Sequence, residues 1–252
     1  MLLVLSPAKT LDETPVKPAI PPTVPVLMED SALLAAKLKT YTPARLKKLM
    51  DISPDLVALN HARYQIWADA AATKPAALLF HGEAYRGLDA KTLDAADMRF
   101  AQRHLRILSG LYGVLKPMDL IAPHRLEMGT KLSMGRGKKD LYAFWGDRVT
   151  AELNAALAKN KADVLVNLAS AEYFKSVRPG SLNARVITPV FKEQTAKGLN
   201  MVAVFAKHQR GAMCRWAIKR RLVEPEGLKE YDGDGYAFQH RESTADEWLF
   251  VR

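Results

Sequence analysis

Three short apolar runs, each followed at once by polar residues, constrain the fold of this chain most. The runs are Met1–Leu5, Ala76–Phe80 and Asp163–Leu168, and each has the length of a buried strand. Ligands of sheets with parallel strands gather beyond the carboxyl ends of those strands. We therefore expect an α/β fold with a mixed sheet flanked by helices, and the 252 residues could form one large domain or two modest ones.

The remaining pattern predicts further strands and several helices. The expected strands are Arg185–Phe191, Asn200–Ala206, Gly235–Phe238 and Glu247–Val251, with a hairpin turn at Lys197-Gly198 between the first two. The expected helices are Ser31–Thr40, Pro43–Met50, Pro54–Ala71, Leu141–Leu157 and Ala212–Leu222. Five prolines within residues 12–25 indicate an extended strap over the surface.

Two of these helices form a pair with capping signals. Thr42 precedes Pro43 and Ser53 precedes Pro54, so each helix has an N-cap and a proline at its first position. The pair has the proportions of a helix-hairpin-helix element near residues 43–68. Its flanking cations are Lys37, Lys39, Arg45, Lys47 and Lys48. The hairpin contains no glycine, and two amphipathic helices that cover one flank of the sheet are the alternative.

The stretch 106–129 is the most distinctive one. Apolar residues from Phe100 to Leu111 recur at helical spacing, and glycines and prolines follow in quick succession. We expect a helix that ends in a constrained loop. The loop would display Arg106, Ser109, Tyr112, Lys116, Arg125 and Glu127. An ordinary helix stop followed by an irregular crossover is the alternative.

The positive charge of the chain is concentrated in two blocks. The net charge is +10. Residues 99–148 contain ten Lys and Arg against four Asp and Glu, and residues 172–221 contain eleven against two. Such blocks attract a polyanion through long-range Coulomb forces, although a solvated basic face is the alternative.

Several classes of protein are excluded or disfavoured. The only cysteine is Cys214, so an intramolecular disulfide and zinc sites built on paired cysteines are excluded. No apolar run reaches the ~20 residues that span a bilayer, and Met1 leads directly into a strand pattern without a secretory leader. We therefore expect a cytoplasmic protein without a membrane partner.

Two histidine-glutamate pairs could ligate a metal. They are His81 with Glu83 and His124 with Glu127, and neither has the spacing of a helical zinc site. We favour hydrogen-bonding roles for them, and we expect neither a metal nor a cofactor.

Six motifs in order give the chain a resemblance to a known family. They are Ser6-Pro-Ala-Lys-Thr-Leu, Arg106-Ile-Leu-Ser-Gly-Leu-Tyr-Gly-Val-Leu-Lys-Pro, Arg125-Leu-Glu-Met-Gly, Leu141-Tyr-Ala-Phe-Trp-Gly, Asn167-Leu-Ala-Ser-Ala-Glu-Tyr-Phe-Lys and Pro189-Val-Phe. With these the chain resembles the bacterial YaaA family of peroxide stress proteins over essentially its whole length.

The resemblance implies a cytoplasmic protein that protects cells during hydroperoxide stress by keeping free iron low. It also implies DNA binding through a positively charged cleft with a helix-hairpin-helix element. The fold that it implies is a single compact α/β domain of unusual topology over residues 1–252. The polar motif positions of the family fall on Lys9, Arg106, Ser109, Arg125, Glu127, Ser170, Lys175, Lys207 and Arg210.

Our leading hypothesis is a DNA-binding stress protein whose distant cations fold into one cleft. The nucleic-acid-binding candidates are Lys9, Arg45, Lys47, Lys48, Arg106, Arg125, Lys175, Lys207, Arg210 and Arg215. Nothing in the sequence supports base reading, so we expect backbone or structure-dependent binding without sequence specificity.

The rival hypothesis is an enzyme of unknown substrate that uses the same cleft. Lys9 or Lys175 beside Glu127 would supply base and acid. The nucleophile would be Ser6, Ser109 or Ser170, with Tyr112 or Tyr173 as a further proton donor. Direct iron sequestration is a third possibility, and one cysteine with six scattered histidines argues against it.

Overall fold

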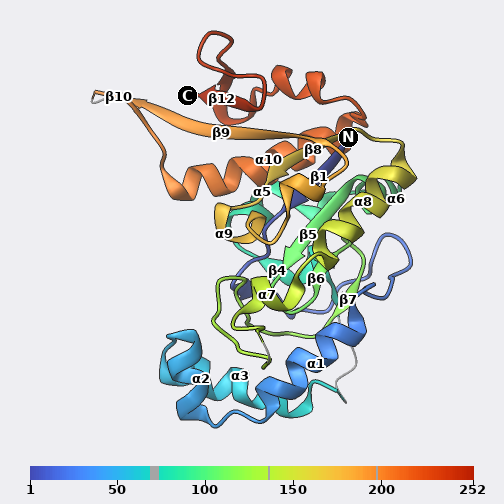
Figure 1. The fold of residues 1–252 in the computed structure, drawn as a ribbon. Coiled ribbons are helices and arrows are strands. Elements are labelled where there is room, and N and C mark those ends of the chain that lie inside the picture. Colours follow the sequence, from blue (N-terminus) through green and yellow to red (C-terminus); the bar gives the residue numbers. More distant parts are fainter. Residues whose placement is uncertain (69–73, 136, 197) are drawn as a thin grey trace.

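A large, mostly parallel sheet runs through the middle of the protein (Figure 1). The computed structural model describes residues 1–68, 74–135, 137–196 and 198–252. In this part of the chain the strands of the sheet are β1 (Leu2–Leu5), β5 (Leu105–Ser109), β6 (Gly113–Leu115), β8 (Val164–Leu168), β9 (Arg185–Thr195), β10 (Gly198–Asn200), β11 (Ala237–Phe238) and β12 (Glu247–Val251). Their order is β11-β12-β9-β8-β1-β5-β6, and β10 pairs with β9.

Strand β1 is the centre of this sheet. It pairs in parallel with β5 on one side, with Leu3 opposite Leu105, and with β8 on the other, with Leu2 opposite Leu165. All four of its residues are buried, as expected for a strand covered on both faces. Strands β8, β9 and β12 continue the parallel pairing, whereas β6, β10 and β11 are antiparallel to their neighbours. The carboxyl ends of β1, β5 and β8 therefore lie at one edge.

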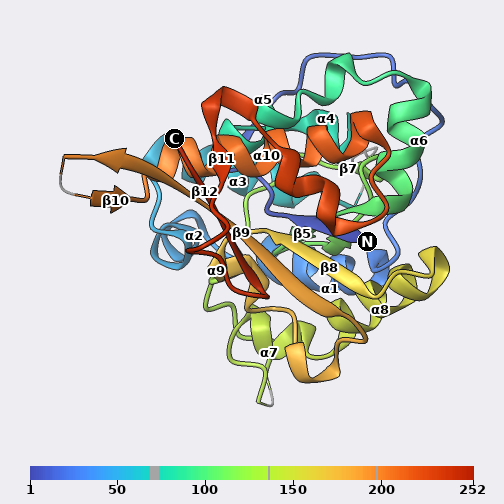
Figure 2. The same cartoon turned by 90° about the horizontal axis from the view of Figure 1, so that it is seen from above.

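Helices cover both faces of the sheet and add a separate layer at one end. They are α1 (Met28–Lys39), α2 (Pro43–Met50), α3 (Pro54–Ile66), α4 (Ala76–Leu79), α5 (Glu83–Leu88), α6 (Ala95–His104), α7 (Leu141–Trp145), α8 (Arg148–Asn160), α9 (Ala171–Phe174) and α10 (Ala203–Arg220). Helices α10 and α5 lie on one face and α8 on the other (Figure 2). Helices α1 to α3 form a layer at the end toward which β5 points (Figure 1).

Short elements complete the described chain. Two-residue strands form two small ladders, β2 (Thr10–Leu11) with β4 (Phe80–His81) and β3 (Lys74–Pro75) with β7 (Leu120–Ile121). The 3-10 turns are η1 (Ala90–Thr92), η2 (Pro179–Ser181), η3 (Pro225–Glu230) and η4 (Gly233–Gly235).

Many of the sequence-based expectations for the elements are confirmed. The predicted strands at Met1–Leu5, Asp163–Leu168 and Glu247–Val251 are β1, β8 and β12, within one residue. Helix α2 has the predicted bounds, and the Thr42 hydroxyl accepts a hydrogen bond from the backbone N–H of Arg45 at 3.3 Å. Strands β9 and β10 form the predicted hairpin, although Lys197 of its turn lies outside the described residues.

The prediction of a strand at Ala76–Phe80 is wrong. Ala76–Leu79 forms the single turn α4, between the two-residue strands β3 and β4. The run contains alanine and leucine without a β-branched residue, and both types favour helix. A buried apolar run of this length does not by itself distinguish a strand from a helical turn.

The helix predicted to enter the 106–129 stretch ends earlier than expected. Helix α6 ends at His104, and Leu105–Ser109 is the fully buried strand β5. Arg106 and Ser109 are therefore strand residues, while Tyr112 is buried in the turn before β6. Pairing with β1 overrides the helical spacing of the apolar residues, because tertiary contacts decide weak local preferences.

Two boundaries around the other helices also differ from the expectation. The predicted strand Asn200–Ala206 is largely the start of α10, which runs from Ala203 and includes the segment Lys207–Gly211. The predicted helix Leu141–Leu157 is divided into α7 and α8 at Gly146, whose φ of 54° and ψ of −122° do not continue a helix. Helix α3 ends at Ile66, and residues 69–71 of its predicted end lie outside the described residues.

Helices α5 and α10 pack so closely that their contact requires glycine. A Cβ on Gly211 would lie 1.6 Å from the carbonyl oxygen of Ala84, and one on Gly87 would lie 2.2 Å from that of His208. Both neighbours are backbone atoms, so neither can move aside as a flexible side chain can. The two glycines fix α10 against α5, and thereby against β1, which α10 also contacts.

We expect Gly211→Ala to lower the free energy of unfolding by at least about 2 kcal/mol, because overpacking exceeds the small gain in helix propensity. Urea denaturation of the two proteins would measure the difference. Gly180→Ala is the matched control, since a Cβ there meets no atom within 4 Å, and its effect should stay below about 0.5 kcal/mol. Equal stability of the Gly211 variant and the wild type would contradict the close approach.

Candidate functional site

Polar residues from β1 and β8 meet where the two strands end. The backbone N–H of Ser170 donates to the hydroxyl oxygen of Ser6 at 2.8 Å, and the two hydroxyl oxygens lie 3.4 Å apart. Tyr85 of α5 donates its hydroxyl to the carbonyl oxygen of Ser6 at 3.0 Å. These bonds tie the loop after β1 to the start of α9 and to α5.

The loop 125–129 crosses directly over the end of β5. A Cβ on Gly110 would lie 2.2 Å from the carbonyl oxygen of Leu126, so only glycine allows this crossing. Tyr64 of α3 donates its hydroxyl to the carbonyl oxygen of Arg125 at 2.8 Å. The loop is thus held between the sheet and the helical layer.

Glu127 joins two cations in this loop. Its carboxylate lies 2.6 Å from Nζ of Lys9 and 3.0 Å from Nη2 of Arg125. The Lys9 side chain is 62% exposed, whereas those of Arg125 and Glu127 are 17% and 24% exposed. Nε of Arg125 is buried and has no hydrogen-bond partner. The Lys9–Glu127–Arg125 cluster therefore carries one surplus positive charge at the edge where β1 ends.

A cavity of about 280 Å³, here called the hairpin hollow, opens beside this cluster. It is lined by Leu49, Met50, Asp51, Arg125, Glu127, Gly129, Thr130 and Glu172. The helical layer thus supplies one wall through the end of α2, and the loop 125–129 with α9 supplies the other. The backbone N–H of Gly129 donates to Glu172 at 2.9 Å and closes the floor between them.

Several cations without an ion pair stand close in sequence to the residues that line the hollow. Lys47 and Lys48 are exposed on α2 next to its wall, Lys131 follows Thr130, and Lys175 lies 5.0 Å above the ring of Tyr142, whose hydroxyl donates to the carbonyl oxygen of Glu172. None of these four cations has an ion pair within the described residues. Exposed cations therefore flank the lining residues along the chain, while the lining itself includes the carboxylates of Asp51, Glu127 and Glu172.

Comparison of the sequence with known proteins identifies the family of the chain. The family model described as peroxide stress protein YaaA matches residues 1–242. The chain belongs to this family of peroxide stress proteins. It is 49% identical to a UPF0246 protein of Teredinibacter turnerae, over all of this chain and 99% of the relative. It is 51% identical to one of Ralstonia nicotianae, also over all of this chain and 99% of the relative.

The structure brings some of the predicted site residues of this YaaA-family chain together. Lys9, Arg125 and Glu127 form one cluster, and Ser170 is linked to the loop that carries Lys9 through Ser6. Lys175 ends α9, on the rim of the hairpin hollow. The predicted pair of helices borders the same hollow and presents Arg45, Lys47 and Lys48 to solvent, with the Arg45 guanidinium 3.9 Å above the Tyr41 ring.

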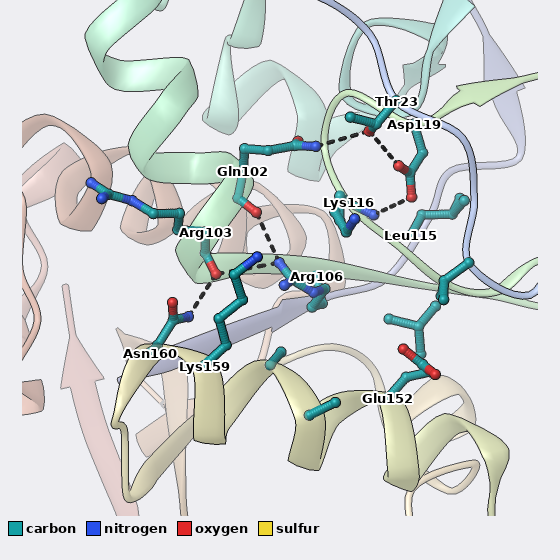
Figure 3. Close-up of a pocket in the computed structure, with 14 residues that line it drawn as sticks. Thr23, Gln102, Arg103, Arg106, Leu115, Lys116, Asp119, Glu152, Lys159 and Asn160 are labelled. Carbon is teal, nitrogen blue, oxygen red and sulfur yellow. Dashed lines mark hydrogen bonds between the residues drawn. The ribbon is translucent and has the colours of Figure 1, made fainter.

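Arg106 lies elsewhere. It is 8% exposed and lines a second cavity, between α6, α8 and the loop after β6, which shares no residue with the hairpin hollow (Figure 3). Burial lowers the pKa of its guanidinium, and Asp119 and Glu152 act against that shift. The sequence-based expectation that Arg106 stands on a loop beside Arg125 is wrong, because β5 carries it inside the molecule.

The three predicted site cations that lie on α10 have separate surroundings. Lys207 is exposed, and Arg210 is half-buried without an ion pair in the described part of the chain, so that desolvation lowers its pKa. Arg215 donates to the carbonyl oxygens of Leu88 and Asp89 at 3.3 and 3.0 Å. Arg215 therefore holds the end of α5.

The candidate metal pairs make structural contacts. Glu83 forms an ion pair with Arg86 at 2.8 Å, and the buried ring of His124 lies 2.9 Å from the carbonyl oxygen of Ala122. Residues 1–68, 74–135, 137–196 and 198–252 contain no group of three or more His, Cys, Asp or Glu arranged to hold a metal ion. In the same ranges no helix is long and apolar enough to cross a membrane.

Sequence reasoning missed Tyr64 and the wall residues Leu49 and Met50. Tyr64 lies one turn after Asn60 on α3, and both are buried. Two buried polar residues on one side of a helix indicate that another segment accepts or donates hydrogen bonds there. This pattern does not identify the loop 125–129 as that segment.

The buried His124 makes the stability of this region depend on pH. Burial lowers its pKa from 6.5 to about 4. As pH falls below about 6.5, His124 becomes protonated in the unfolded chain. In the folded chain it stays neutral until about pH 4. The stabilising contribution is therefore complete above pH 6.5 and decreases toward pH 4, by about 3 kcal/mol at 1.36 kcal/mol per pKa unit.

We expect His124→Asn to remove this contribution. The difference in free energy of unfolding between wild type and variant should shrink by about 3 kcal/mol from pH 7 to pH 4. Urea titrations at half-unit pH steps would measure it. His240→Asn, at an exposed position, is the control and should follow the wild type throughout. A constant wild-type-to-variant difference across this range would contradict the burial of a neutral imidazole.

Proposed function

We propose that the protein binds the DNA backbone through the basic rim of the hairpin hollow, and that this binding serves the peroxide stress response. Membership of the YaaA family supports the stress role. The DNA contact is our own extension from the charges of the site. The observation that carries it is the set of unpaired cations around the hollow.

Unpaired cations matter because a phosphate contact gains free energy by releasing condensed counterions. Arg45, Lys47 and Lys48 on α2, together with Lys131 and Lys175 across the hollow, are exposed and have no ion pair in the described residues. These five form the rim set. The Lys9–Glu127–Arg125 cluster contributes less, since Glu127 already neutralises one of its two cations.

The connection between α2 and α3 supports backbone binding at this place. Asp51 ends α2 with φ 48° and ψ 60°, a left-handed conformation that glycine adopts most readily. The chain therefore turns at Asp51 without a glycine, and we propose this turn as the hairpin of a helix-hairpin-helix element. The Asp51 carboxylate repels a phosphate inside the hollow, so our proposal assigns the contacts to the rim set.

We further propose that lower free iron in stressed cells follows from this binding to DNA. Its support is the stress role of the family. Cells that produce a rim-set variant should then show the free iron level of cells that lack the protein. Measuring chelatable iron by electron paramagnetic resonance during peroxide exposure tests this, and wild-type iron levels with a variant that no longer binds DNA would contradict it.

The double variant Lys47→Gln/Lys48→Gln should weaken DNA binding and reduce its salt dependence. Each lost phosphate contact lowers the log-log salt slope by about 0.9, so the slope should fall by about 1.8. Fluorescence anisotropy of a labelled duplex over a salt series would measure both quantities.

The matched control replaces two cations that have no ion pair in the described residues, Lys161 at the end of α8 and Lys229 in η3, which lies over the Trp248 ring at 4.6 Å. Lys161→Gln/Lys229→Gln changes the net charge equally and should leave the slope within experimental error. An equal loss in both double variants would show that net charge alone attracts DNA, and a wild-type slope without salt dependence would refute the proposal.

An enzyme is the second candidate, and the Lys9–Glu127–Arg125 cluster beside Ser6 and Ser170 favours it. A half-buried carboxylate between two cations and next to hydroxyl groups is a plausible arrangement for acid-base or nucleophilic chemistry. In this case Glu127 would act on a substrate held in the hairpin hollow.

Glu127→Gln distinguishes the two functions. The substitution frees Lys9 and Arg125 from their shared carboxylate, so a DNA binder should bind the duplex as tightly as before or up to about tenfold more tightly. An enzyme should lose turnover. Anisotropy measures the first outcome, and weaker DNA binding by the variant would contradict the rim model. Glu83→Gln, which also breaks one ion pair but lies on α5, is the control.

A further inference from the structure

The second cavity has the size of a small-molecule site. Its volume is about 330 Å³, at the lower end of the range for ligand pockets. Its walls come from the end of α6, the strand β6 with the loop that follows, the middle of α8, and the strap through Thr23 and Val26 (Figure 3). We call it the Arg106 cavity.

Arg106 is fixed in this cavity with half of its guanidinium uncommitted. Nη1 donates to the carbonyl oxygens of Gln102, Arg103 and Leu105, at 3.1, 3.3 and 2.8 Å. Within the described residues Nε and Nη2 have no hydrogen-bond partner, and neither is sealed from solvent as Nε of Arg125 is. This edge of the guanidinium matches two oxygens of a phosphate or carboxylate.

The charge of Arg106 is only partly compensated, by the nearby carboxylates of Asp119 and Glu152. It forms no ion pair in the described part of the chain, although its side chain is almost wholly buried. Figure 3 shows the Lys159 side chain extending from α8 toward it. A buried charge that lacks a partner is costly, and a second cation nearby raises that cost.

The other charged groups of the cavity leave a positive surplus. Asp119 is engaged by its own neighbours, since the Thr23 hydroxyl donates to it at 2.5 Å and the Lys116 backbone N–H at 2.8 Å. Four cations and two carboxylates line the cavity in total. The charged lining residues are Arg103, Arg106, Lys116, Lys159, Asp119 and Glu152. Figure 3 shows the Arg103 guanidinium directed away from Arg106, so the cations that remain exceed the carboxylates by one. A positive surplus favours a phosphate monoester, which is anionic near neutral pH.

We infer that the Arg106 cavity binds a small organic phosphate monoester. The phosphoryl oxygens lie on the Nε–Nη2 edge of Arg106 and on the ammonium of Lys159. The organic part lies against the apolar groups of Val114, Leu115 and Ala156. The three carbonyl contacts of Nη1 orient the guanidinium before the ligand arrives, which reduces the entropy lost on binding.

The site is independent of the proposed DNA contact. No residue of the rim set lines the Arg106 cavity, so either proposal can fail alone. Phenyl phosphate is a suitable probe because it combines a phosphate monoester with a compact apolar group. Isothermal titration calorimetry of the full chain would measure its binding, with benzoate and inorganic phosphate as comparison ligands.

We expect saturable 1:1 binding of phenyl phosphate, at least about tenfold tighter than that of benzoate or inorganic phosphate. Lys159→Gln, at an exposed position, should weaken binding about fivefold, as for one screened charge contact. Arg106→Lys keeps the charge but loses the two-nitrogen edge, and should weaken binding more than about tenfold. Its thermal unfolding, measured in parallel, identifies any loss of folded protein.

Lys161→Gln is the matched control, because it removes an exposed cation two residues further along that does not line the cavity. Its affinity should equal that of the wild type. An equal loss in the Lys159 and Lys161 variants, the absence of saturable binding, or benzoate binding as tight as that of phenyl phosphate would each overturn the inference.

Discussion

The parallel pairing of β1 with β5 and β8 is the constraint on which the rest of the structure depends. It directs three strands toward one edge, so that Ser6, Gly110 and Ser170 follow them at neighbouring places. The loop 125–129 can cross that edge only because Gly110 has no side chain. The register of the strands therefore determines where the Lys9–Glu127–Arg125 cluster and the hairpin hollow form. The charges act only once the strands have brought these residues together.

The electrostatics of the two cavities differ in kind. At the hairpin hollow the interior is acidic, and the free cations stand on the rim, where water screens them and a long polyanion can reach them. In the Arg106 cavity the cation is buried and lines the wall. The protein, whose net charge is +10, thus has cations at two kinds of place. Those on the surface suit an extended anionic partner, and the one in the cavity suits a compact anion.

The sequence predicted the elements whose structure depends on neighbouring residues. It did not predict the elements whose structure depends on pairing with strands far away in the sequence. The caps at Thr42 and Ser53, the apolar runs of β1 and β8, and the polar residues that follow those strands all indicated their structures correctly. The grouping of Lys9, Arg125 and Glu127 was also among the predicted arrangements.

Arg106 could not be located in the same way. Its neighbours have helical spacing, and only the presence of β1 beside them turns the segment into a strand that buries the guanidinium. The start of α10 is a similar case, since the run around Val204 and Phe205 fits a strand as well as a helix, and its close contact with α5 settles the choice. Tertiary contacts of this kind leave no trace in a short window of sequence.

The position of β1 at the start of the sequence also affects how the chain folds during its synthesis. Leu3 pairs with Leu105 and Leu2 with Leu165, so the central strand has no neighbour until β5 has left the ribosome and lacks its second until β8 has followed. Contacts so distant in sequence slow folding, because loop closure must precede the gain from pairing. During that interval the nascent chain exposes an unpaired, wholly apolar strand, the kind of segment that chaperones bind and that otherwise aggregates.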